Sequence, residues 1–212
     1  MSHEFIPDTQ DEKTTLRTLQ HRMRTKSLPT VAKWMVQVQD WRNDLGAVGK
    51  YEGLRPWTSL PGKRLTGVAR TERAMNILDC VAIQALGGAE VAAALMQQQP
   101  ETLRTWSITS ALRDTLVDLS QNPQRRAFTN SAGISKCIHT SSILYSFGMD
   151  RILVPFEMMM LQGHSQGLRI PPQMSKASLQ ALAGMGVSLP CLGQILLAMM
   201  LTTGLSDYPS RR

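Results

Sequence analysis

A run of glycines and prolines divides the chain, because a regular helix or strand cannot easily cross it. The loop-rich stretch extends from Asn43 to Gly67, and its chain-breaking residues are Gly46, Gly49, Gly53, Pro56, Pro61, Gly62 and Gly67. Clusters of this kind are typical of turns and irregular connections. We therefore expect the regular elements of the fold to lie on either side of this stretch.

The residues after this stretch show helical periodicity. Apolar residues spaced for one face predict an amphipathic helix from Thr71 to Leu86, with Thr71 as its N-cap and Gly87-Gly88 ending it. Further helices are expected at 89–98, 109–119, 157–162, 176–182 and 190–201, an extended segment within 134–147, and a helix-permissive stretch at 12–38 with a boundary near Leu28. The predicted fold class is mainly α with a few short strands, an α+β chain.

Composition places the chain among soluble globular proteins. It has 212 residues, of which 42% are hydrophobic and 18% charged, and this excludes a wholly disordered chain or a collagen-like repeat. We expect a flexible tail at 1–11, a helical and loop-rich region at 12–135, a distinct block with a closing helix at 136–205, and a tail at 206–212. One domain, or one domain with a subdomain, fits this length.

The chain carries a net positive charge, and most of its basic residues are arginines. The formal net charge is +7, and the 23 basic residues are 16 Arg and 7 Lys. Arginine binds phosphate through a rigid fork of donors, so this excess favours a phosphate-bearing partner. A solvated surface that is simply basic remains the alternative.

Cysteines and apolar runs predict a soluble intracellular protein. Cys80, Cys137 and Cys191 are far apart, and this odd number indicates a reducing compartment. The four histidines show no metal spacing, so no metal site is expected. The apolar run Leu189–Leu205 contains polar interruptions and is too short for a membrane span, which favours a buried helix and no membrane partner.

One segment is distinctive. From Asp150 to His164 the chain reads DRILVPFEMMMLQGH, and this resembles the ninth conserved motif of the DNA cytosine-5 methyltransferases. The matching residues are Arg151, Leu153, Pro155, Glu157, Leu161, Gln162 and Gly163, and Val154 stands where threonine is usual. An ordinary loop–helix ion pair of Arg151 with Glu157, next to plain core packing, would also explain some of these residues.

Two other stretches resemble neighbouring motifs of the same family, in the same order. Leu182–Pro190 is similar to the tenth motif, with Gly184, Gly186 and Val187 matching and Met185 in the place of asparagine. Near the N-terminus, Gln20–Arg24 fits the eighth motif, in which Arg22 and Arg24 are the basic positions. In the family, the tenth motif completes the S-adenosylmethionine pocket, and the region between the eighth and ninth motifs reads the DNA sequence.

The resemblance implies the C-terminal part of an S-adenosylmethionine-dependent methyltransferase-type α/β fold without its catalytic core. The Gly-rich first motif, the Pro-Cys nucleophile loop and the Glu-Asn-Val motif are not found. Pro190-Cys191 repeats the Pro-Cys dipeptide but lies within the tenth-motif match, and we expect Cys191 to be a small buried core residue. No catalytic residue is therefore assigned. The ninth-motif residues Arg151, Glu157, Gln162 and Gly163 are expected to be structural.

Two functions follow from this interpretation. The first is a partial cytosine-5 methyltransferase that binds duplex DNA and transfers a methyl group only when a complementary catalytic half supplies what is missing. S-adenosylmethionine would be its cofactor, and its location would be nuclear in a eukaryote. The second is a non-catalytic basic helical module that binds DNA or a protein. Candidate DNA contacts are Arg22, Arg24, Arg125 and Arg126.

Overall fold

The computed structural model describes residues 28–63, 65–129, 137–186 and 188–202. The chain divides into two compact units, each described by itself below. Unit 1 comprises Met1–Lys136 and Leu144–Ile152, and unit 2 comprises Cys137–Ile143 and Leu153–Arg212. The expected block at 136–205 therefore contains a short segment, Leu144–Ile152, that belongs to unit 1.

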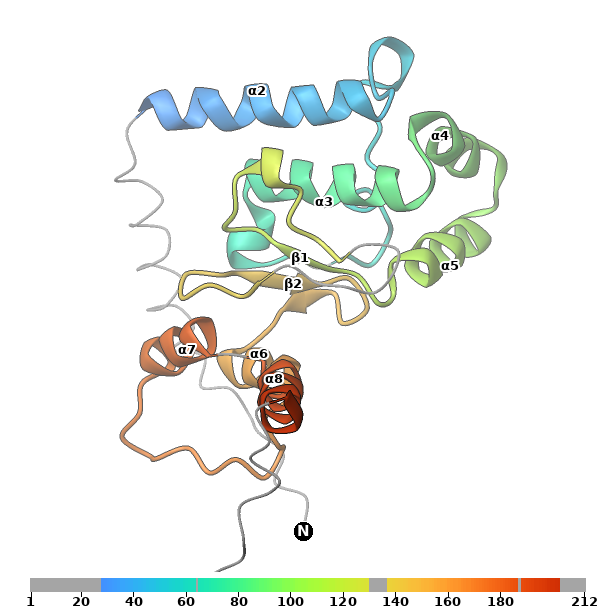
Figure 1. Cartoon of the computed structure of the whole chain (residues 1–212). Coiled ribbons are helices and arrows are strands. Elements are labelled where there is room, and N and C mark those ends of the chain that lie inside the picture. Colours follow the sequence, from blue (N-terminus) through green and yellow to red (C-terminus); the bar gives the residue numbers. More distant parts are fainter. Residues whose placement is uncertain (1–27, 64, 130–136, 187, 203–212) are drawn as a thin grey trace, which may run out of the picture. The chain divides into compact units, whose positions relative to one another are not determined.

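Helices dominate the described residues (Figure 1). The elements of unit 1 are α2 (Leu28–Asp44), η1 (Gly49–Tyr51), η2 (Gly67–Arg70), α3 (Glu72–Ala85), α4 (Ala89–Gln98), α5 (Glu101–Leu112), β1 (Leu116–Asp118), η3 (Pro123–Arg125), β2 (Leu144–Ser146) and β3 (Arg151–Ile152). Those of unit 2 are α6 (Pro155–Leu161), α7 (Lys176–Met185) and α8 (Leu189–Thr202). The predicted α+β character is confirmed.

Helix α3 is the central helix of unit 1 and lies between α2 and the sheet in Figure 1. The Thr71 side chain accepts a hydrogen bond from the Ala74 N–H, so the predicted N-cap is confirmed. The helix ends before Gly87 and Gly88, whose φ angles of 93° and 113° suit glycine. Of the predicted apolar face, Ala74, Ile77, Leu78 and Val81 are buried, whereas Leu86 is half-buried at the C-cap. Helix α4 begins at the predicted residue, Ala89.

The predicted boundary near Leu28 is the start of a helix. Pro29 lies in the first turn of α2, where its missing N–H costs no hydrogen bond, and the helix then extends beyond Val38 to Asp44. The predicted helix at 109–119 is wrong in both of its limits. The helix starts after Pro100 and ends at Leu112, and Leu116–Asp118 forms β1 instead. Pairing of β1 with β2 overrides the helical spacing.

The sheet is antiparallel, with the strand order β1-β2-β3. Val117 pairs with Tyr145 in β2, and Tyr145 also pairs with Ile152 in β3. The extended segment expected within 134–147 is thus confirmed at Leu144–Ser146. On this strand and the turn after it, Tyr145 and Phe147 pack edge-to-face with Trp57, at ring-centroid distances of 6.5 and 4.7 Å. These rings form the aromatic core of unit 1.

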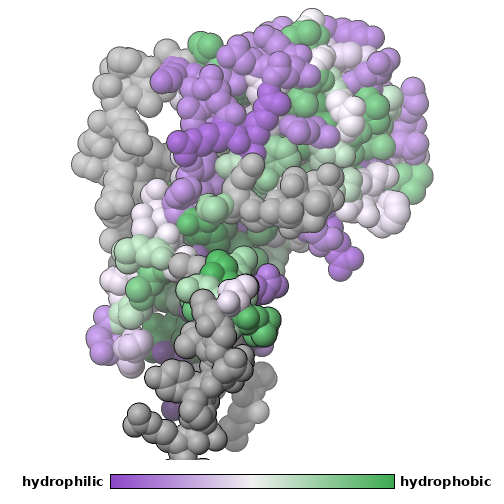
Figure 2. Space-filling model, viewed as in Figure 1, coloured by the Kyte–Doolittle hydropathy of each residue, from purple (hydrophilic) through white to green (hydrophobic). Residues whose placement is uncertain are grey.

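Helix α8 differs from its prediction. It was expected to be buried, yet the structure describes none of its residues as buried, and Cys191 is exposed as well. Both predictions are wrong. Apolar composition alone does not determine whether another part of the protein covers a helix. Figure 2 shows hydrophobic side chains reaching the surface in the part of unit 2 that contains α8.

Length and hydropathy make Lys176–Thr202 one candidate for a membrane span. It contains α7 and α8, which are separate helices in the described residues. Helix α8 alone, with 14 residues, is about 21 Å long, shorter than the ~30 Å hydrocarbon core of a bilayer. The bent pair α3 and α4 would be a second candidate if it formed one span, and one or two candidates of this kind are weak evidence for a membrane protein.

Candidate functional site

The two motif-like segments of unit 2 meet at the side chain of Gln162. Its amide nitrogen donates a hydrogen bond to the carbonyl oxygen of Ala183 and a longer one, 3.4 Å, to that of Gly186. The backbone N–H of Leu189 returns a hydrogen bond of 2.8 Å to the Gln162 carbonyl oxygen. Gln162 is 6% exposed, so these bonds form away from bulk water. The end of α6 is therefore fixed to the end of α7 and the start of α8.

Glycines make this junction possible. A Cβ on Gly163 would lie 2.6 Å from Cδ of Pro190, and the φ of Gly163, 90°, is one that other residues rarely adopt. A Cβ on Gly184 would lie 2.0 Å from the backbone nitrogen of Thr140, and one on Gly186 would lie 2.5 Å from Oε1 of Gln162. Backbone atoms require a glycine at Gly184, and the positive φ requires one at Gly163, whereas the Gln162 side chain would have to move to admit a Cβ at Gly186.

The same contacts test the expected cofactor site. Protein atoms fill the space beside Gly184 and Gly186, and Val187 lies outside the described residues. These glycines do not fit a cradle for S-adenosylmethionine in this chain. Binding of this cofactor stays a prediction for a protein completed by a catalytic half.

The remaining ninth-motif residues flank the start of α6. Glu157 accepts a hydrogen bond of 2.9 Å from the Val154 N–H, and Pro155 occupies the first turn, so both define the helix start. Arg151 lies in β3 of unit 1, is exposed, and donates 3.1 Å to the Ile152 carbonyl oxygen. The side chain of Glu157 thus caps the N-terminus of α6, which is a structural role of the kind predicted for this residue.

The predicted DNA contacts differ in their surroundings. Arg22 and Arg24 lie outside the described residues. Arg125 is exposed on η3 and donates 3.1 Å to the side chain of Gln121. Arg126 forms an ion pair with Asp44 and lies 5.7 Å from the centre of the Trp41 ring. Arg126 therefore links η3 to α2, whereas Arg125 is accessible to a partner.

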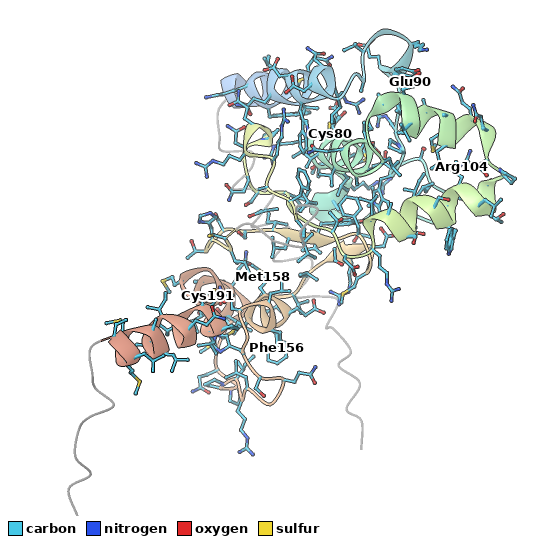
Figure 3. All side chains as sticks on the ribbon, turned by 45° about the vertical axis from the view of Figure 1, so that its right-hand side comes forward. Cys80, Glu90, Arg104, Phe156, Met158 and Cys191 are labelled. Carbon is cyan, nitrogen blue, oxygen red and sulfur yellow. The ribbon has the colours of Figure 1, made fainter. Side chains whose placement is uncertain are left out.

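The three cysteines differ in their surroundings. Cys80 is buried in α3, and burial raises its pKa to about 12, so it is a neutral thiol. Cys191 lies on the exposed α8 (Figure 3) and Cys137 is exposed as well. Among the residues that the structure describes, no group of three His, Cys, Asp or Glu side chains could hold a metal ion.

A partly buried polar network in unit 1 was not predicted. The Trp57 indole N–H donates 3.0 Å to the Tyr145 hydroxyl, which donates in turn to the Asp150 carboxylate. Lys63 Nζ lies 3.6 Å from this carboxylate and 3.2 Å from the centre of the Trp57 ring. Burial raises the pKa of Tyr145 and lowers that of Lys63. No spacing in the sequence could reveal the network, because its members come from distant segments.

A fully buried carboxylate, Asp79, fixes the backbone at Trp57 and Thr58. It accepts hydrogen bonds of 3.0 and 2.9 Å from their N–H groups and one of 2.6 Å from the Thr58 hydroxyl. Burial raises the pKa of Asp79, while these hydrogen bonds and the charge of Arg42 oppose the rise. Asp79 thereby holds the aromatic core to α3.

Comparisons with protein-family models, with curated proteins and with solved structures found no match to this chain.

Proposed function

We propose that the chain is the C-terminal part of a DNA cytosine-5 methyltransferase-like protein, in which unit 1 provides a duplex-binding recognition region. One observation carries the proposal. Gln162 and Gly163, from the ninth-motif segment, contact Ala183, Gly186 and Pro190 of the tenth-motif segment. Two stretches selected by sequence resemblance alone are therefore packed on each other, and the contacts include the matching residues Gln162, Gly163 and Gly186.

The same geometry supports an architectural rather than catalytic role. Glu157 closes a helix, Gln162 bridges two helix ends, and the glycines permit close packing. None of these contacts activates a nucleophile or a base. Methyl transfer would then depend on a complementary half that brings its own thiolate and cofactor site.

Charge supports the duplex as the partner. The net charge of +7 attracts a polyanion, and hydrophilic residues cover much of the face of unit 1 seen in Figure 2. Arg125 offers an exposed guanidinium on η3, next to the ion-paired Arg126. A non-catalytic DNA-binding module would use the same surface, so it shares the test below and differs only in the absence of methyl transfer.

The DNA-binding prediction concerns salt dependence. The parent chain is expected to bind duplex DNA with an affinity that falls steeply between about 50 and about 200 mM salt, because each phosphate contact releases counterions. A triple variant, Arg22→Ala with Arg24→Ala and Arg125→Ala, is expected to lose up to about three units of the log–log salt slope, about one per contact. Fluorescence anisotropy of a labelled duplex measures both quantities.

Arg126 is kept in that variant because its guanidinium is already paired with Asp44. The matched control is Arg169→Ala, which removes an exposed arginine from unit 2 and is expected to leave the slope unchanged. Heparin, titrated in parallel, measures the response of a merely basic surface. A triple variant that binds duplex as tightly as the parent at every salt concentration would refute the assigned contacts.

A further inference from the structure

A basic hollow lies on unit 1, apart from the arginines that the sequence singled out. Its volume is about 410 Å³, and it is lined by Thr58, Lys63, Leu65, Thr66, Arg70 and Met75. This set contains two cations and two hydroxyl groups and no Asp or Glu. The volume is in the range of sites that hold small organic groups.

Lys63 is held in place at this hollow. Its side chain is 11% exposed, and its ammonium group lies over the Trp57 ring and 3.6 Å from the Asp150 carboxylate. That carboxylate also accepts the hydroxyl proton of Tyr145, so its negative charge is shared between two donors. The lysine is therefore preorganised, and an anion at the hollow would meet a positive charge that needs no reordering.

Arg70 is the second cation, and it is free to turn toward a ligand. It is the last residue of η2 and is exposed, and within the described residues its guanidinium has no hydrogen-bond or ion-pair partner. Thr58 donates its hydroxyl proton to Asp79, which fixes that side chain. The Thr66 hydroxyl remains as a donor. One fixed cation, one adjustable cation and a hydroxyl donor are groups that bind a phosphate.

We propose that this hollow binds a phosphate group of the duplex DNA backbone. The assignment rests on the proposed function and adds to it a second point of contact on unit 1. A phosphodiester carries one negative charge, which matches a site where Asp150 already balances part of the Lys63 charge. Leu65 and Met75 supply apolar surface for the adjoining deoxyribose.

The experiment compares two arginine-to-glutamine variants of the full chain. Arg70→Gln is expected to weaken duplex binding about fivefold at about 50 mM salt and to lower the salt slope by about one unit. The control Arg113→Gln removes another exposed arginine of unit 1, which does not line the hollow, and should change the affinity less than twofold. Lys63→Gln is expected to weaken duplex binding in the same way as Arg70→Gln. The result for Arg70→Gln is decisive, because Arg70 is exposed and its replacement leaves the core intact.

The outcomes separate this inference from the proposed function. If the parent binds duplex with a steep salt slope and Arg70→Gln behaves like Arg113→Gln, phosphate binding by the hollow is refuted. The role of unit 1 as a recognition region then stands. If the parent does not bind duplex at all, both are refuted.

A last arm titrates deoxycytidine monophosphate and inorganic phosphate as competitors. Displacement of the duplex only at millimolar concentrations supports a backbone site, whereas micromolar binding that requires Arg70 would assign the hollow to a free nucleotide instead.

Discussion

Gly184→Ala is expected to destabilise unit 2 by about 2 kcal/mol, even though alanine is the better helix former. The new methyl group would lie 2.0 Å from the Thr140 nitrogen and 2.2 Å from the His139 carbonyl carbon, and both are backbone atoms. Such overpacking costs about 1–3 kcal/mol or more. It therefore exceeds the gain of ~1 kcal/mol in helix propensity. Hydrogen exchange of the α7 amides measures the change.

Gly193→Ala is the matched control for this substitution. Gly193 lies within α8, and nothing would come within 4 Å of its Cβ. The same change is expected to stabilise the helix by about 0.5–1 kcal/mol. The two variants should thus shift stability in opposite directions. A Gly184→Ala protein that is as stable as Gly193→Ala would show that the segment 137–143 does not pack on α7.

Asp79→Ala is expected to lower the free energy of unfolding by about 4 kcal/mol. Its carboxylate satisfies the N–H groups of Trp57 and Thr58 and the Thr58 hydroxyl, and Asp79 itself is fully buried. Each unsatisfied buried donor costs about 1–3 kcal/mol. Urea unfolding followed by tryptophan fluorescence reports the loss, since Trp57 is in the affected segment.

The control for this second substitution is Asp40→Ala, in which the aspartate is exposed on α2. It is expected to change stability by less than about 0.5 kcal/mol. Asp79→Asn keeps an acceptor oxygen for the two N–H groups. Its loss of unfolding free energy should therefore lie between those of Asp79→Ala and Asp40→Ala. Equal losses for Asp79→Ala and Asp40→Ala would contradict the anchoring role of Asp79.

Local signals explain which elements the sequence could predict. Helix α3 was found because its N-cap, its apolar spacing and its terminal glycines all lie within the helix or next to it. Strand β1 was missed because Leu116–Asp118 becomes a strand only through pairing with β2, far along the chain. Exposure of α8 was also unpredictable, since an apolar helix is the same in sequence whether or not a neighbour covers it.

The candidate site was predictable to the extent that it depends on short motifs. Gln162, Gly163, Gly184 and Gly186 were selected by resemblance. Gln162, Gly163 and Gly186 lie at the junction of α6 with α7 and α8, whereas Gly184 packs on the backbone of Thr140. The Lys63–Asp150 pair and the hollow beside it carry no motif, because their residues are joined by folding and not by spacing. In the sequence, nothing distinguishes Arg126 from its neighbour Arg125. In the structure, Arg126 forms an ion pair with Asp44 and Arg125 does not.

A methyl-transfer assay tests whether the chain lacks a catalytic centre of its own. The full chain is mixed with duplex DNA and S-adenosylmethionine labelled on its methyl group, and label on cytosine is counted. We expect no transfer by the chain alone, because Cys80 is a buried thiol with a raised pKa and the exposed Cys191 lies on an apolar helix that supplies no base. Transfer by the purified chain that is lost in Cys191→Ser would contradict the account and make Cys191 the nucleophile.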